Sequence, residues 1–198
     1  MAFDFSLSPS EFFSLSVPIL RGKDWKKKYL LPETADLFPE KSFGEVGMSW
    51  HEEGMTIGAL VKHSVEDPEK DTLELFFDTR DLKKAGFSTR FCHHFLISPQ
   101  EGGSREMTRF RTEDAHPLCE SSDLEVTFTL ERSCYSIQVF IPAHCLHGYD
   151  PHAFDRLGFT YRLNRYRGEP QHFAVSSQHY SIDQQPSLWA SLKLIKPT

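Results

Sequence analysis

The sequence predicts an all-β protein, a two-sheet antiparallel β-sandwich of the immunoglobulin-like or jelly-roll-like kind. Short stretches in which apolar and polar residues alternate recur along the 198 residues, and such alternation is typical of strands with one buried face. Turn-forming residues separate these stretches at the spacing of about 8–12 residues that sandwiches and barrels share. Helical periodicity is almost absent. We therefore expect one β-sandwich domain over residues 1–198, in which residues 20–43 form a long irregular loop or arm.

A central strand is predicted within residues 71–78, Asp-Thr-Leu-Glu-Leu-Phe-Phe-Asp. At a period of two residues, Leu73, Leu75 and Phe77 share one face, while the opposite face also carries the large apolar Phe76. Because both faces hold large apolar groups, this strand belongs in the middle of a sheet.

The remaining strands follow from the same alternation. In chain order, we expect them at residues 10–19, 45–50, 55–62, 91–97, 107–111, 124–130, 135–141, 158–164, 171–176 and 188–194. Pro18 indicates that the first strand lies near a sheet edge, because proline cannot donate to a ladder. Gly54 permits the positive φ of a hairpin between the second and third of these strands. Residues 143–155 predict one helical turn at most.

The composition argues against several classes of partner. A hydrophobic fraction of 39% and an aromatic fraction of 13% are ample for one core. The net charge of −6, from 22 basic and 28 acidic residues, is spread along the chain, so we expect no nucleic-acid partner and no membrane partner. No stretch approaches the ~20 apolar residues that cross a bilayer, and the N-terminus lacks a secretory pattern. We expect a cytoplasmic protein, and no pattern indicates its oligomeric state.

The cysteines predict thiols rather than a disulfide framework. Cys92, Cys119, Cys134 and Cys145 show no close pair spacing and lie within or beside expected strands. We interpret all four as reduced, buried thiols.

Five motifs follow one another in a fixed order along most of the chain. They are Trp-His-Glu-Glu-Gly-Met-Thr-Ile-Gly-Ala-Leu-Val at 50–61, Asp-Thr-Leu-Glu-Leu-Phe-Phe-Asp at 71–78, Tyr-Ser-Ile-Gln-Val-Phe-Ile at 135–141, Leu-Gly-Phe-Thr-Tyr at 157–161 and Trp-Ala-Ser-Leu-Lys-Leu-Ile at 189–195. Their order, over about residues 44–196, resembles the family 9 carbohydrate-binding modules and the wider group that includes the DOMON domains. The resemblance implies a sandwich of the carbohydrate-binding-module type and a glycan or protein ligand.

The resemblance also implies a sugar site that this chain has altered. In sugar-binding members, two tryptophans clamp a terminal sugar by stacking, and the matching positions here hold Pro68 and Asp183. Neither side chain can stack, so affinity would depend on hydrogen bonds that compete with water. Tyr180 and His179 are near the second position in sequence and offer a substitute ring.

Three more residues are candidates for ligand binding because they are polar and lie on or beside the central strand pair. They are Glu74, Arg90 and His94. No Gly-x-Ser-x-Gly motif occurs, so we predict no catalytic residue.

Carboxylates around the turn after the central strand suggest a cation site. Asp78 and Asp81 are the candidate ligands for calcium, the candidate cofactor. The alternative is a turn capped by aspartate, in which these carboxylates pair with Arg80 or Arg90.

The pair His93 and His94 suggests a different metal site. Neighbouring residues of a strand point to opposite faces, so the two histidines cannot both bind one ion. One of them would have to meet another group across the fold, such as Cys92, His116, Cys119 or the cluster at residues 144–147. No CxxC or HExxH spacing is present.

These observations give three hypotheses. The first is a non-catalytic binding module with a glycan or protein ligand and without the aromatic clamp. The second is a metal-dependent enzyme or metalloprotein that uses the strand with His93 and His94. The third is a protein-interaction scaffold that has kept the sandwich and lost the sugar site.

Overall fold

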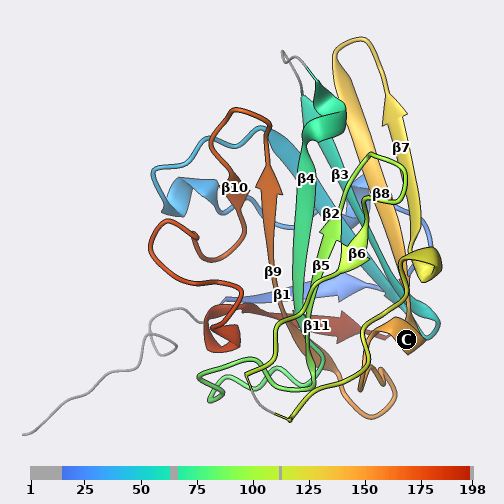
Figure 1. Cartoon of the computed structure of the whole chain (residues 1–198), viewed down its shortest axis with the longest axis vertical. Helices are drawn as coiled ribbons and strands as arrows, with labels where there is room; N and C mark the ends of the chain where they lie inside the picture. Colours follow the sequence, from blue (N-terminus) through green and yellow to red (C-terminus); the bar gives the residue numbers. More distant parts are fainter. Residues whose placement is uncertain (1–14, 63–66, 112, 197–198) are drawn as a thin grey trace, which may run out of the picture.

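Alternating apolar side chains build two β-sheets that pack face to face (Figure 1). The computed structural model of the chain describes residues 15–62, 67–111 and 113–196. The larger sheet has the order β1 (Ser16–Leu20), β11 (Ala190–Ile195), β9 (Arg156–Asn164), β4 (Thr72–Asp78), β5 (Cys92–Ile97) and β6 (Arg105–Glu106), with β10 (Gln171–His172) also paired to β9. The smaller sheet has the order β2 (Gly44–His51), β3 (Gly54–Lys62), β8 (Cys134–Pro142) and β7 (Glu125–Leu130). The predicted β-sandwich is confirmed.

All strand pairs but one are antiparallel in the described part of the chain; β1 runs parallel to β11. The helical elements described are single 3-10 turns. They are η1 (Lys27–Tyr29), η2 (Ala35–Leu37), η3 (Pro68–Lys70), η4 (Ser121–Asp123), η5 (Ala143–Cys145) and η6 (Pro186–Leu188). Within the ranges that the structure describes, no helix has the length and apolar character needed to cross a membrane.

Strand β4 lies in the middle of the larger sheet, as its sequence predicts, between β9 and β5. Its residues Leu73, Leu75 and Phe77 face the core between the two sheets. Phe76 points to the other side and is also fully buried. The outer face of the larger sheet is therefore covered in turn by another part of the chain.

That cover is the connection between β10 and β11. Its apolar side chains form a second cluster with Phe76 and Cys92 on the outer face; they are Val175, Ile182, Leu188 and Trp189, with Tyr180 packed against them. The indole of Trp189 donates a hydrogen bond to the carbonyl of Ile182 at 2.7 Å, which closes the connection on itself. This connection positions the site described below.

Several strand boundaries differ from the sequence-based expectation. The last strand begins at Ala190 because η6 turns Leu188 onto the outer cluster. In place of a strand over 107–111, the chain pairs with β5 earlier, through β6. The strand expected at 171–176 shortens to β10, and residues 10–14 of the first expected strand lie outside the described residues.

The cysteine prediction is wrong for two of the four residues. Cys119 and Cys145 form a disulfide, with their Cα atoms 4.9 Å apart although 26 positions separate them in sequence. The fold brings the segment before η4 against η5, which residue spacing alone does not reveal. Cys92 is buried and Cys134 is half-buried, and neither is in a disulfide.

Candidate functional site

Glu74 is the centre of a polar network on the outer face of the larger sheet. Its position in β4 places it opposite Arg162 of β9. Its Oε1 accepts hydrogen bonds from Nε and Nη2 of Arg162, at 3.0 and 2.6 Å, and from Nδ2 of Asn164 at 2.7 Å. Its Oε2 accepts a hydrogen bond from Nε2 of His94 at 2.8 Å. Every polar atom of the carboxylate is thus engaged by a neighbouring strand.

This network keeps Glu74 ionised. Burial by itself would raise the pKa of the carboxyl group, but the hydrogen bonds from His94 and Arg162, together with the charge of Arg162, lower it to about 2. A carboxylate with so low a pKa is unsuited to general acid catalysis near neutrality. Its role in this geometry is to fix the guanidinium of Arg162, whose side chain remains 30% exposed.

A hollow of about 390 Å³ lies beside this guanidinium. It is lined by Arg162 and by residues 177–183 of the connection that covers the outer face. Tyr180 lines the hollow while it packs on the outer apolar cluster, and His179 is exposed at the same hollow. The fold therefore brings Tyr180 and His179 together with Arg162, and through Arg162 with Glu74 and His94.

Asp183, the position that the family resemblance matches to a stacking tryptophan, also lines this hollow. Pro68, the other matching position, begins η3 just before β4. Neither residue supplies an aromatic ring. Tyr180 and His179 supply the aromatic rings among the residues that line the hollow.

The other candidate ligand residue, Arg90, is placed elsewhere. It lies in the segment before β5, is exposed, and pairs with the carboxylate of Asp114. It is not among the residues that line the hollow. His94, in contrast, stacks on Phe76 with ring centroids 4.2 Å apart, which holds its imidazole against Glu74.

Asp78 and Asp81, the candidate calcium ligands, are both engaged by the protein. The carboxylate of Asp78 accepts hydrogen bonds from the backbone amides of Arg80 at 3.0 Å and Leu82 at 2.6 Å, which is the aspartate-capped turn of the alternative. The pairing expected with it differs, because Asp81 pairs with Lys83 and Arg90 pairs with Asp114. Asp81 accepts a hydrogen bond from the hydroxyl of Ser191 at 2.6 Å, and the ammonium of Lys83 lies 2.8 Å from its other oxygen. Lys83 supplies a positive charge here, and calcium at this turn stays a prediction.

A second polar cluster lies on the core side of β5. His93 meets Glu106 of β6 and His116, one of the partners that the sequence suggests for it. Burial would raise the pKa of Glu106, but hydrogen bonds from His116 and His93 lower it to about 2. Burial lowers the pKa of His93. Two groups in the described residues have the composition and proximity to hold a metal ion, this one and the group Cys119, Asp123 and Cys145.

Sequence reasoning did not select Arg162, Asn164 or Glu106. A signal for Arg162 and Asn164 exists. The alternation in β9 directs Tyr161 and Leu163 to the core and therefore directs Arg162 and Asn164 to the outer face of the sheet. Nothing local marks Glu106, since its two histidine partners come from a different strand and a later loop.

The chain has a β-sandwich fold like that of carbohydrate-binding modules. Two solved structures of a family 9 carbohydrate-binding module from Caldicellulosiruptor kristjanssonii share this fold. The complex with cellotriose has a TM-score of 0.63 at 14% identity, over 92% of this chain and 95% of that one. The complex with glucose has a TM-score of 0.61 at 14% identity, over 92% and 97%. At the level of sequence, no protein-family profile and no curated protein matches the chain.

Proposed function

We propose that this protein is a non-catalytic binding module whose ligand is a glycan, bound in the hollow formed by Arg162 and residues 177–183. The observation that carries the proposal is the partly exposed side chain of Arg162, which lines the hollow and is held by the buried carboxylate of Glu74. The shared fold with modules solved in complex with cellotriose and glucose supports the class of ligand. No reaction is part of the proposal.

The chemistry of the lining suits sugar hydroxyl groups. Arg162 presents a planar set of N–H donors, and Ser177, Gln178 and Ser181 add small polar groups around the same hollow. Because Glu74 and Asn164 already fix this part of β9, binding would not have to order the guanidinium, which reduces the entropic cost of association. Tyr180 provides a ring for the apolar face of a sugar.

A hollow with one phenol ring and an exposed imidazole predicts weaker binding than a clamp of two tryptophans. Stacking aromatic rings contribute on the order of 1 kcal/mol each beyond their area, and the remaining hydrogen bonds are in competition with water. We therefore expect dissociation constants nearer to the millimolar than the nanomolar range, and short oligosaccharides to bind better than monosaccharides.

A protein-interaction scaffold is the second candidate. The observation that favours it is Asp183, a charged residue in the hollow at the position that the resemblance matches to a sugar-stacking tryptophan. On this alternative, residues 177–183 bind a protein partner, and no sugar stabilises the chain.

The test is a thermal-shift screen of the purified chain against mono- and oligosaccharides, followed by calorimetry. A ligand that binds only the folded state stabilises it by RT ln(1 + [L]/Kd), about 2.7 kcal/mol at a hundredfold excess over Kd. We expect one class of sugar to raise the melting temperature of the wild type and of Tyr180→Phe, but not of Tyr180→Ala. Arg156→Ala, which removes an exposed arginine at the other end of β9, is the matched control and should bind as the wild type does. If no sugar raises the melting temperature, the protein-interaction scaffold is the remaining candidate. If Tyr180→Ala binds sugar as the wild type does, the sugar site lies elsewhere.

A further inference from the structure

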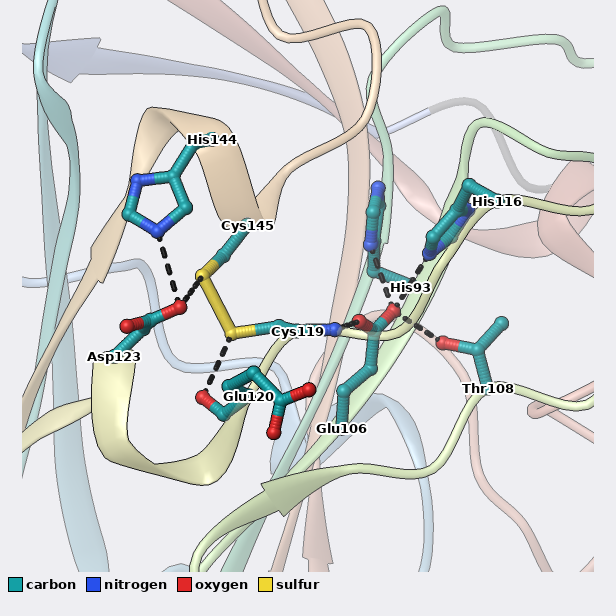
Figure 2. The surroundings of a disulfide bond; sticks show 9 residues. All are labelled: His93, Glu106, Thr108, His116, Cys119, Glu120, Asp123, His144 and Cys145. Atoms are coloured by element: carbon teal, nitrogen blue, oxygen red, sulfur yellow. Dashed lines mark hydrogen bonds and ion pairs between the residues drawn. A yellow bond between two sulfur atoms is a disulfide. The ribbon is translucent and has the colours of Figure 1, made fainter.

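Three side chains, two of them sealed from solvent, converge on one carboxylate oxygen. Oε1 of Glu106 lies 2.8 Å from Nδ1 of His93, 2.9 Å from Nε2 of His116 and 2.7 Å from the hydroxyl of Thr108 (Figure 2). The side chains of His93 and Glu106 have no exposed surface, and that of His116 is 1% exposed. Oε2 of Glu106 is fixed separately, by the backbone amide of Cys119 at 2.7 Å.

The hydrogen bonds of His116 call for a proton or a metal ion between its Nε2 and this oxygen. Nδ1 of His116 lies 2.7 Å from the carbonyl of Arg90, and a carbonyl oxygen only accepts, so Nδ1 carries a proton. In a neutral imidazole, Nε2 then holds a lone pair, and it faces an oxygen of the Glu106 carboxyl group at 2.9 Å. A second proton or a metal ion must lie between the two atoms.

The contacts of His93 are compatible with a metal ion. In a neutral ring whose Nδ1 donates its proton to Glu106, Nε2 has no proton, and in the described structure Nε2 is buried without a hydrogen-bond partner. The backbone of His147 lies near this ring. If Nδ1 instead binds a metal, Nε2 carries the proton and can donate it to that backbone. Both histidines would then bind through the nitrogen that faces Glu106 and direct the other N–H to the main chain, the usual arrangement around a protein-bound metal.

We propose that His93, Glu106 and His116 form a binding site for one divalent transition-metal ion, of which zinc is the first choice. Two imidazoles and one carboxylate are a common donor set for zinc, and they suit it better than calcium, which prefers oxygen. The ligands come from β5, from β6 and from the loop after β6, so the ion ties this loop to the larger sheet. Because the three side chains are sealed from solvent, the ion stabilises the fold and takes no part in a reaction.

The disulfide belongs to the second group of potential metal ligands, Cys119, Asp123 and Cys145, which lies next to this site. Figure 2 shows Cys119 between the two, with its amide directed to Glu106 and its sulfur bonded to Cys145, beside Asp123 and His144. Sulfur atoms joined in a disulfide are not thiolates and do not hold zinc. The two groups can therefore be told apart by whether thiolate binds the metal.

The first experiment uses the full chain, stripped with a chelator and then titrated with zinc or with cobalt(II). We expect one ion per chain and visible cobalt bands without a thiolate charge-transfer band in the near ultraviolet. Glu106→Gln and His116→Gln should each weaken binding by more than the roughly 10–100-fold that loss of an outer partner costs. His144→Ala, which removes an exposed histidine beside the disulfide, should bind as the wild type does. A thiolate band or no uptake of metal overturns the proposal. So does a metal affinity of the Glu106 and His116 variants equal to that of the wild type.

The second experiment needs no variant and so does not depend on whether a variant folds. Nitrogen-15 spectra of the wild-type histidine side chains report which ring nitrogens carry protons. With one equivalent of zinc, we expect Nε2 of His116 and Nδ1 of His93 to carry no proton. If Nε2 of His116 carries a proton in the presence of zinc, a proton and not a metal occupies the site.

Discussion

Glu74 links the stability of the larger sheet to the candidate ligand site. Its carboxylate is 8% exposed and holds groups from both neighbouring strands, Arg162 and Asn164 from β9 and His94 from β5. Such a buried charge is tolerated because it is paired and fully hydrogen-bonded. One side chain therefore serves the packing of three strands and the orientation of the guanidinium at the hollow.

The first prediction concerns the pH dependence of this residue. The pKa of Glu74 falls from its ordinary value of 4.5 to about 2 on folding. Its contribution to stability is then fully present above pH 4.5 and is lost as the pH falls towards 2; by linkage it is on the order of 3 kcal/mol. Glu74→Gln should lower the free energy of unfolding near neutral pH, and its difference from the wild type should shrink between pH 4.5 and 2. Urea unfolding at a series of pH values measures both quantities.

Glu45→Gln is the matched control for this prediction. Glu45 is an exposed carboxylate on β2, 3.8 Å from the ammonium of Lys62, and exposed pairs of this kind contribute little. We expect it to change the unfolding free energy by less than about 1 kcal/mol at any pH. If Glu74→Gln also changes the unfolding free energy by less than about 1 kcal/mol at every pH, Glu74 does not stabilise the packing of the three strands.

At the scale of elements, the arm that follows β1 lies against the outer face of the smaller sheet. Its residue Trp25 is placed over two glycines, Gly47 of β2 and Gly58 of β3. A Cβ atom at Gly47 would be 2.7 Å from Nε1 of the indole, and one at Gly58 would overlap the same ring. The absence of side chains at these two positions makes the groove in which the tryptophan lies.

The second prediction tests this packing. Gly58→Ala should displace Trp25, destabilise the chain by about 1–3 kcal/mol, as overpacking typically does, and shift tryptophan fluorescence to longer wavelength. Thermal unfolding and emission spectra measure the two effects. Gly86→Ala, where an added Cβ meets nothing within 4 Å, is the control and should leave both unchanged. An equal response of the two variants would mean that Trp25 is not held by the sheet.

The third prediction concerns the disulfide, which ties the segment before η4 to η5. Closing a loop between positions 26 apart should stabilise the chain by about 3 kcal/mol in the chain-entropy account. The double variant Cys119→Ser and Cys145→Ser should therefore melt at a lower temperature, and a reductant should lower the melting temperature of the wild type alone. Cys134→Ser, which removes a half-buried thiol outside the disulfide, should melt as the wild type does. No response to the reductant in the wild type would argue that the bond does not form in solution.

At the scale of the whole molecule, local sequence patterns predict the strands and the sandwich because each strand carries its own alternation. The two apolar faces of β4 predict its central place, and Pro18 predicts an edge strand; β1 is indeed the last strand on its side of the sheet. These features depend on residues within a few positions of one another. They are therefore visible without knowledge of the fold.

The site is less visible because its contacts join distant parts of the chain. Glu74 and Arg162 are 88 positions apart, and the two cysteines of the disulfide are 26 apart. The turn at η6, which places Leu188 and Trp189 on the outer face, ends an alternation that reads as one continuous strand in sequence. Tertiary packing decides such positions, and a single sequence carries no record of it.

The most direct test of the proposed function is a map of backbone NMR shifts in the folded chain as an oligosaccharide such as cellotriose, or another sugar that stabilises it, is added. We predict that the largest shifts fall on residues 177–183 and on Arg162 and its β9 neighbours, and that they saturate with a single affinity. Shifts centred on another surface, such as the hollow near Leu31 and Phe43 beside the arm, or no shifts with any sugar, would contradict the account.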